Sequence, residues 1–163
     1  MSKELDNLEH LLAQLIDEHR KLLKHVDAQQ AAMKAFKIDA VEDTTHLQEA
    51  TRLRINNLET RRRAAIAQVA KAIRSNENLT ITRLIELFPP RTKQLTKLRD
   101  ELRAVVEQIQ QKTSIAGKLG GAVLGHLNTA LRILVNAVQQ GGVYTKHGSP
   151  KVAGRIGTMD AVG

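Results

Sequence analysis

Histidine and cysteine are the residue types that most often mark a metal site, and neither does so in this sequence. The six histidines contain no HExxH motif. No two of them are three or four residues apart, the spacing that places two imidazoles on one face of a helix. The chain has no cysteine, so it has no thiolate ligand or nucleophile. We predict no metal site.

Other patterns that carry catalysis are also missing. There is no G-x-S-x-G motif and no Ser/His/Asp signal, and the carboxylates lie mainly on faces predicted to meet solvent. The glycine-rich stretch AGKLGGAVLG at residues 116–125 lacks Gly-Lys-Ser/Thr and follows no strand, so it is not a phosphate loop. We therefore predict no catalytic residue and no cofactor, and a protein that is not an enzyme.

Arginine forms the strongest charged cluster, at Arg61, Arg62 and Arg63. Three consecutive helix positions point in directions about 100° apart, so they do not form one stripe that follows a phosphate backbone. Aromatic residues, on which bases would stack, are 2% of the chain. We do not predict nucleic acid as the partner, and a basic helical nucleic-acid-binding protein is kept as an alternative interpretation.

Charge is distributed unevenly along the chain, whose net charge is +8. Residues 1–51 carry 6 basic and 10 acidic side chains, and residues 52–163 carry 19 and 7. The basic part could attract an acidic protein, a nucleic acid or an anionic membrane surface. Its sign alone does not choose among these three partners.

The composition predicts that the histidines, arginines and glycines named above lie mainly on helices. Good helix formers dominate residues 1–77 and 91–140, and β-branched residues never alternate with period two. The predicted fold class is all-α, an elongated antiparallel helical hairpin or bundle of three long helices plus one short helix, with a flexible Gly-rich C-terminal tail. We expect a helical domain at residues 1–140 and the tail at 141–163, where six glycines occur in 23 residues.

Apolar residues at alternating intervals of three and four set the helix boundaries. The first long helix is expected from about Glu4 to Phe36, with the polar residues His19 and Gln29 in its seam, where they set the register or turn outward. The second is expected from Ala40 to about residue 73, with Asp39 and Glu42 forming an N-terminal capping arrangement. Its expected seam is Val41, Thr44, Leu47, Thr51, Ile55, Leu58, Ala65, Val69 and Ile73.

The second half of the chain is expected to hold the remaining helices. A short helix is predicted at Thr80–Leu87 and a third long helix from about Arg91, after the double proline, to Gln139. Gly117, Gly121 and Gly125 share one face of that helix. Either close approach of another helix or a hinge would explain them.

Nothing in the sequence indicates export or membrane insertion. The N-terminal residues MSKELDNLEH lack the apolar segment that a secretory signal requires. The most apolar stretch, residues 119–138, contains His126, Asn128 and Arg132, which are costly at the centre of a bilayer. A cytoplasmic protein without membrane insertion is expected.

The order of these elements and the sequence ALRILVNAVQQGGVYTKHG, residues 130–148, resemble the FlgN family of flagellar export chaperones. In that family a Leu-rich end of the last helix is followed by a Tyr and, a few residues on, a Gly. The resemblance covers essentially the whole chain. The glycine cluster at residues 117–125 departs from the family pattern.

The resemblance implies a cytoplasmic chaperone that binds the C-terminal helical segments of hook-filament junction proteins and brings them to the type III export gate. A client helix needs an apolar groove, which Leu124, Leu127, Leu131, Leu134 and Val138 could offer. The same face could instead be covered by the chain's own helices or by a second copy, as in a homodimer. Tyr144 matches the family Tyr that is linked to docking on the export gate. The alternative from another class is a structural coiled-coil scaffold.

Overall fold

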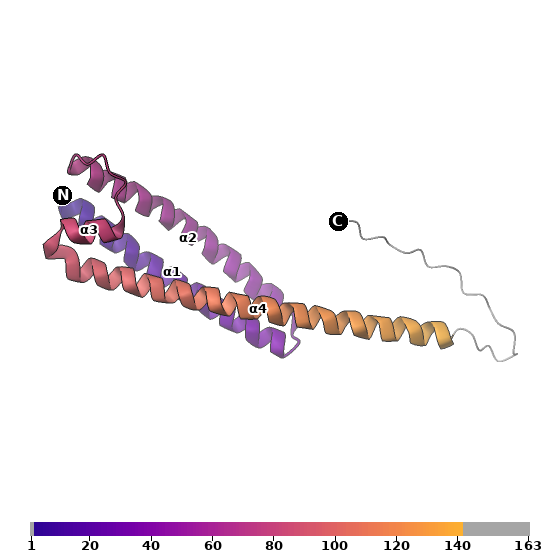
Figure 1. Ribbon diagram of the computed structural model, residues 1–163. Helices are drawn as coiled ribbons and strands as arrows, with labels where there is room; N and C mark the ends of the chain where they lie inside the picture. The colour runs from indigo at the N-terminus through magenta and orange to yellow at the C-terminus, as the bar shows by residue number, and fades with distance from the viewer. Residues whose placement is uncertain (1, 142–163) are drawn as a thin grey trace, which may run out of the picture. The chain divides into compact units, whose positions relative to one another are not determined.

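The computed structural model describes residues 2–141, of which 91% are helical and none lies in a strand. Its elements are α1 (Ser2–Lys34), α2 (Ile38–Ala72), α3 (Ile81–Leu87), a 3-10 helix (Pro89–Arg91) and α4 (Thr92–Gly141) (Figure 1). The all-α fold class predicted from the sequence is confirmed. The chain divides into two compact units, residues 1–120 and 121–163.

Polar contacts between helices give the directions of the long helices in the first unit. Arg54 Nε donates to Glu18 Oε2 at 2.8 Å, and Gln29 Nε2 donates to Thr45 Oγ1 at 2.9 Å, so α2 runs antiparallel to α1. The hydrogen bond from Lys21 and then that from Arg54 lower the pKa of the Glu18 carboxyl. The bond from Gln29 agrees with the predicted role of that residue in setting the register.

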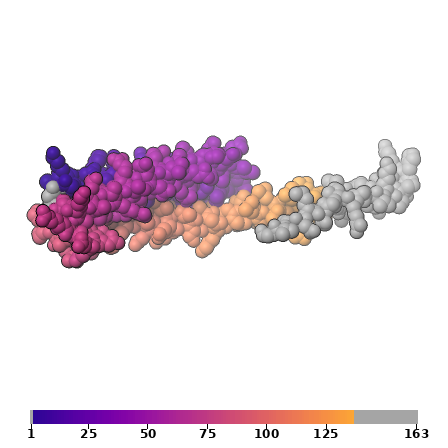
Figure 2. All heavy atoms as spheres, turned by 90° about the horizontal axis from the view of Figure 1, so that it is seen from above, coloured from indigo at the N-terminus to yellow at the C-terminus, as the bar shows by residue number. Residues whose placement is uncertain are grey.

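The first part of α4 runs parallel to α1. Arg91 contacts Asp6 at 2.6 Å, and Arg20 near the middle of α1 contacts Glu101 at 3.2 Å. Farther along both helices, Lys112 contacts Asp27. In space-filling view, α1, α2 and the first part of α4 lie side by side (Figure 2). Residues 1–120 are thus a bundle in which an antiparallel pair is joined by a third long helix.

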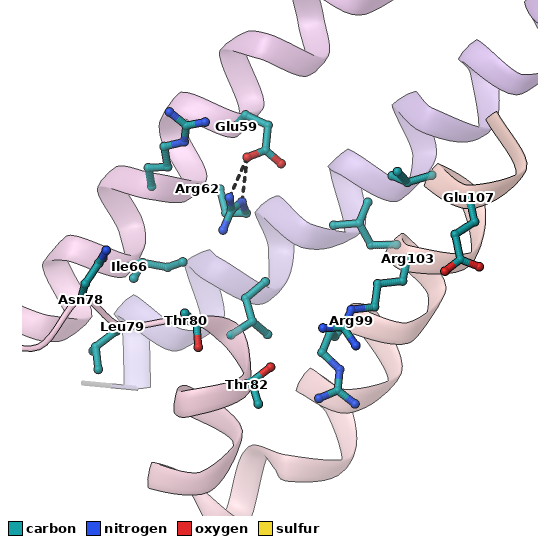
Figure 3. Close-up of a pocket in the computed structure, with 14 residues that line it drawn as sticks. Glu59, Arg62, Ile66, Asn78, Leu79, Thr80, Thr82, Arg99, Arg103 and Glu107 are labelled. Atoms are coloured by element: carbon teal, nitrogen blue, oxygen red, sulfur yellow. Dashed lines mark hydrogen bonds and ion pairs between the residues drawn. The ribbon is translucent and has the colours of Figure 1, made fainter. Parts of the chain in front are cut away.

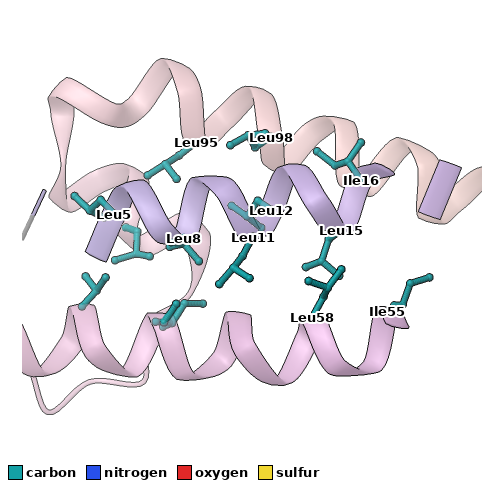
Figure 4. Packing of buried hydrophobic residues seen from close by; sticks show 14 of the residues in the cluster. Leu5, Leu8, Leu11, Leu12, Leu15, Ile16, Ile55, Leu58, Leu95 and Leu98 are labelled. Carbon is teal, nitrogen blue, oxygen red and sulfur yellow. The ribbon is translucent and has the colours of Figure 1, made fainter. Parts of the chain in front are cut away.

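Leucines of α1 form the centre of the core. Leu8, Leu11, Leu12 and Leu15 are at most 1% exposed, and residues of α2 and α4 surround them (Figure 4). Burying one such side chain contributes about 1.5–3 kcal/mol. The fully buried Leu84 adds α3 to the same cluster. The core is therefore built almost entirely from aliphatic side chains, in agreement with an aromatic content of 2%.

Phe36, rather than Asp39, makes the turn between α1 and α2. Its φ is 55°, and the amides of Phe36 and Lys37 donate to the carbonyls of Met33 and Ala32 at 3.1 and 2.9 Å, which is a Schellman motif. α2 begins at Ile38 with no side-chain cap. The capping arrangement predicted for Asp39 is wrong, because this residue already lies in the first helical turn.

The seam of α2 also differs from the predicted one. Leu47, expected on the seam, is 49% exposed, whereas Gln48 is 5% exposed. The buried positions Thr44, Gln48, Thr51, Ile55 and Leu58 keep the regular spacing of four and three. Thr51 tolerates burial because its hydroxyl donates to the Leu47 carbonyl at 2.8 Å. The regular spacing of the helix therefore determines which residues are buried, so Gln48 lies in the seam although Leu47 is more hydrophobic.

The segment between α2 and α4 agrees with the predicted boundaries to within one residue. Thr80 is the N-cap of α3, and its Oγ1 accepts a hydrogen bond from the amide of Arg83 at 3.1 Å. Pro89 and Pro90 begin the 3-10 turn, where their missing amide hydrogens cost nothing. α4 follows from Thr92. In the part of the chain that the structure describes, no helix is long and apolar enough to cross a membrane.

The backbone conformation just after the end of α2 leads to a testable prediction. Arg74 has a φ of 55° and closes a second Schellman motif. Its amide donates to the carbonyl of Lys71, and the amide of Ser75 donates to the carbonyl of Ala70. A residue with a Cβ is strained in this conformation, and glycine is not. We expect Arg74→Gly to raise the free energy of unfolding by about 0.5–1 kcal/mol in chemical denaturation. Arg74→Ala, which keeps the Cβ, should give no gain; an equal gain from both variants would contradict this account.

Candidate functional site

The described part of the second unit is the end of α4, which exposes a row of leucines. Leu124, Leu127, Leu131 and Leu134 follow one another at intervals of three and four, and they are 65, 41, 58 and 61% exposed. This spacing places them along one face of the helix. Val138, the fifth predicted member of the face, lies in α4 by its backbone, but its side chain is outside the described residues.

Apolar side chains extend the leucine row around the helix. At about 100° per residue, Val123, Ala130, Ile133 and Val135 widen it to roughly half of the circumference, with His126 between Ala130 and Ile133. Arg132, Asn128 and Asn136 occupy the other half. A helix packed on one side needs an apolar stripe of only about 100°. The end of α4 therefore carries more apolar surface than one neighbouring helix would cover.

We call Leu124, Leu127, Leu131 and Leu134 the α4 leucine face. Its side chains are hydrocarbon and contain no group that could transfer a proton or hold an ion. Surface of this kind binds an amphipathic helix through contacts at i, i+3, i+4 and i+7. The leucine face is thus suited to binding rather than to chemistry. Among the described residues, no group of three or more His, Asp or Glu side chains could hold a metal ion.

Glycines 117, 120, 121 and 125 lie around the start of this face. A Cβ added at Gly117, Gly121 or Gly125 would meet no atom within 4 Å, whereas one at Gly120 would lie 3.6 Å from the Met33 side chain. α4 is helical throughout this stretch. The division between the two units falls between Gly120 and Gly121. Both explanations offered by the sequence, close approach of another helix and a hinge, stay predictions for these glycines.

A second surface joins residues that the sequence analysis did not connect. Arg62 and Arg63 of α2 and Arg99 and Arg103 of α4 line one open groove in the first unit. Arg62 is also paired with Glu59 on its own helix at 2.7 Å. Sequence spacing alone does not show this convergence, because it depends on which faces of α2 and α4 meet in the bundle.

Comparison with protein families gives a match over most of the chain. The model of a family described as FlgN protein matches residues 1–151. The chain belongs to the FlgN family. FlgN proteins are flagellar export chaperones, so membership gives this chain a general role in flagellar assembly and protein export. Neither the curated proteins nor the solved structures compared with the chain gave a significant match.

The FlgN match extends over the leucine face and continues past the end of α4. The resemblance seen in the sequence is therefore confirmed at the level of the family. Tyr144 lies within the matched residues but outside those that the structure describes. Its docking role, and the binding role of individual leucines, stay predictions.

Proposed function

We propose that this FlgN protein binds the C-terminal helical segments of hook-filament junction proteins on the α4 leucine face and delivers them to the type III export gate. The observation that carries the proposal is the row of four leucines left 41–65% exposed on one face of a helix. Such a row is costly in water unless a partner covers it. The role is one of binding and release in the cytoplasm and includes no catalytic step.

The size of the leucine face is compatible with a reversible complex. Covering the exposed part of one leucine contributes about 1–2 kcal/mol, so four give roughly 4–8 kcal/mol before the costs of association. The neighbouring apolar side chains add to this gain. A micromolar dissociation constant corresponds to about 8 kcal/mol. Because association itself costs at least about 4 kcal/mol, the four leucines alone would bind more weakly than this, and the neighbouring apolar side chains must supply the remainder.

Delivery requires a second contact, because the leucine face is occupied while the client is carried. Residues 141–163 contain Tyr144, the sole tyrosine, and the basic residues Lys146, Lys151 and Arg155. A tyrosine ring supplies a large contact area with only two side-chain torsions to fix. We therefore assign Tyr144 to the export gate and the leucines to the client.

Complex formation with a client segment tests this function. The purified chain is mixed with the C-terminal segment of a hook-filament junction protein, and the mass is measured by size-exclusion chromatography with light scattering. We expect a complex heavier than the 18.1 kDa chain by the mass of the bound segment. A stable oligomer of the chain alone that ignores the segment would contradict the proposal and favour a structural coiled-coil scaffold.

A further inference from the structure

The groove between α2 and α4 is a large open hollow in the first unit. Its volume is about 860 Å³, and α2, residues 78–82 and α4 line it. In Figure 3, Glu59, Arg62 and Ile66 of α2 lie on one side and Arg99, Arg103 and Glu107 of α4 on the other, with Leu79 and Thr80 at one end. We call this hollow the arginine groove.

Positive charge dominates the arginine groove. Four arginines and two glutamates line it. Arg62 is paired with Glu59 at 2.7 Å, and Arg99 contacts only its neighbour in sequence, Asp100, at 2.9 Å. Within the described residues, Arg63 and Arg103 form no ion pair. Two guanidinium groups on opposite walls are therefore free to bind an anionic partner.

Between the arginines, the lining is apolar. Ile66 and Leu79 are buried, and Ile81, Leu102 and Val106 are partly exposed within the groove. An anion that is only charged would gain nothing from these side chains. A helix with carboxylates along its edges and apolar side chains between them would meet both the arginines and the apolar lining.

The groove fits a nucleic acid less well than an acidic helix. Its lining contains no aromatic side chain on which a base could stack. Glu59 and Glu107 stand among the arginines and would repel a continuous phosphate backbone. The chain's own C-terminal residues carry Lys146, Lys151 and Arg155, whose charge has the wrong sign. Charge complementarity thus favours an acidic segment of another protein.

We propose that the arginine groove is a docking site for an acidic amphipathic helix of a partner protein, separate from the α4 leucine face. The apolar side of that helix contacts Leu102 and Val106, and its carboxylates contact Arg63 and Arg103. Arginine–carboxylate pairs at such a rim give orientation and a fast, salt-sensitive association.

Fluorescence polarisation with the full chain tests this docking site. The probe is a labelled helical peptide of about five turns, with leucines on one face and glutamates on the other. A peptide of the same composition with scrambled order is the first control, and a single-stranded oligonucleotide of similar length is the second. We expect the ordered peptide to bind best and its affinity to fall as salt is raised.

Charge reversal locates the binding. Arg63→Glu combined with Arg103→Glu should weaken binding of the ordered peptide by about tenfold or more. Arg61→Glu, on the same helix but outside the lining, should change the affinity by less than about twofold. Arg63→Gln with Arg103→Gln gives the same comparison without reversed charge, and circular dichroism checks that all variants remain helical.

Several results would overturn the docking site. Three results would show that the peptide is held only by nonspecific electrostatic attraction to the basic chain. These are an equal loss of affinity in Arg61→Glu, equal binding of the scrambled peptide, and unchanged affinity in the double variants. Tighter binding of the oligonucleotide, lost in the double variants, would make the groove a nucleic-acid site. Self-association that disappears with the double variants would make it a contact between copies of the chain. Because an amphipathic peptide also suits the α4 leucine face, the titration is repeated on Leu131→Asp. Binding that is kept in Leu131→Asp and lost in the double variants assigns the peptide to the groove; the reverse pattern overturns the docking site and leaves the proposed chaperone function standing.

Discussion

Leu127→Asp, Leu131→Asp and Leu134→Asp should each abolish binding of a junction-protein segment. A carboxylate placed in an apolar contact must lose its water without gaining a partner, which costs at least about 3 kcal/mol, or more than 100-fold in affinity. The chain itself should be almost unaffected, since these side chains are 41–61% exposed in the structure. We expect a stability loss below about 1 kcal/mol, mostly from helix propensity. Isothermal titration calorimetry and thermal unfolding of the same samples measure both quantities.

Asn136→Asp is the matched control for the three leucine variants. It introduces the same charge in the same helix, on the side turned away from the leucine row, and Asn136 is also exposed. Its client affinity should stay within about twofold of the original. If the leucine variants unfold, these residues are core. If they bind normally, or if Asn136→Asp fails equally, the client does not use this face.

Tyr144→Ala should separate delivery from binding. Removing an aromatic anchor from an interface commonly costs more than about 1 kcal/mol, so gate affinity should fall by roughly fivefold or more. The residue lies after the end of α4, outside the leucine face, so client affinity and melting temperature should be nearly unchanged. Secretion of junction proteins should decrease in cells that carry this variant. The secretion assay and a client titration on the same variant provide the comparison.

Tyr144→Phe tests whether the ring or the hydroxyl is needed. If the ring acts as an anchor, this variant should retain most of the secretion that Tyr144→Ala loses. Loss of client binding in Tyr144→Ala would place the tyrosine in the client contact instead. Full secretion in Tyr144→Ala would remove its assigned role.

Periodicity predicted the helices well because leucine spacing and helix geometry are local. The expected Thr80–Leu87 helix and the start of the last helix near Arg91 each lie within one residue of the structure. The turn at Phe36 was not predictable in the same way. A non-glycine residue with φ of 55° has no sequence signal, and the Asp39–Glu42 pattern pointed two residues too far along the chain.

Tertiary arrangement limited the prediction of sites. The leucine face could be located from the sequence, and the structure adds that its four leucines are 41–65% exposed. The arginine groove depends on the antiparallel approach of α2 to α4, which brings Arg63 opposite Arg103. The triple arginine was visible in the sequence, and its three directions argued against a single stripe. From the sequence alone, therefore, only the α2 wall of the groove could have been suspected.

Hydrogen–deuterium exchange, measured with and without the junction-protein segment, tests the central claim most directly. Amides in a helix whose side chains are exposed exchange through frequent local opening, and a bound partner suppresses that opening. The proposed function predicts slower exchange at residues 121–136 when the segment is added, with the core positions of α1 unchanged. Protection that appears only within residues 1–120, or no protection at all despite complex formation, would contradict the leucine face as the client site.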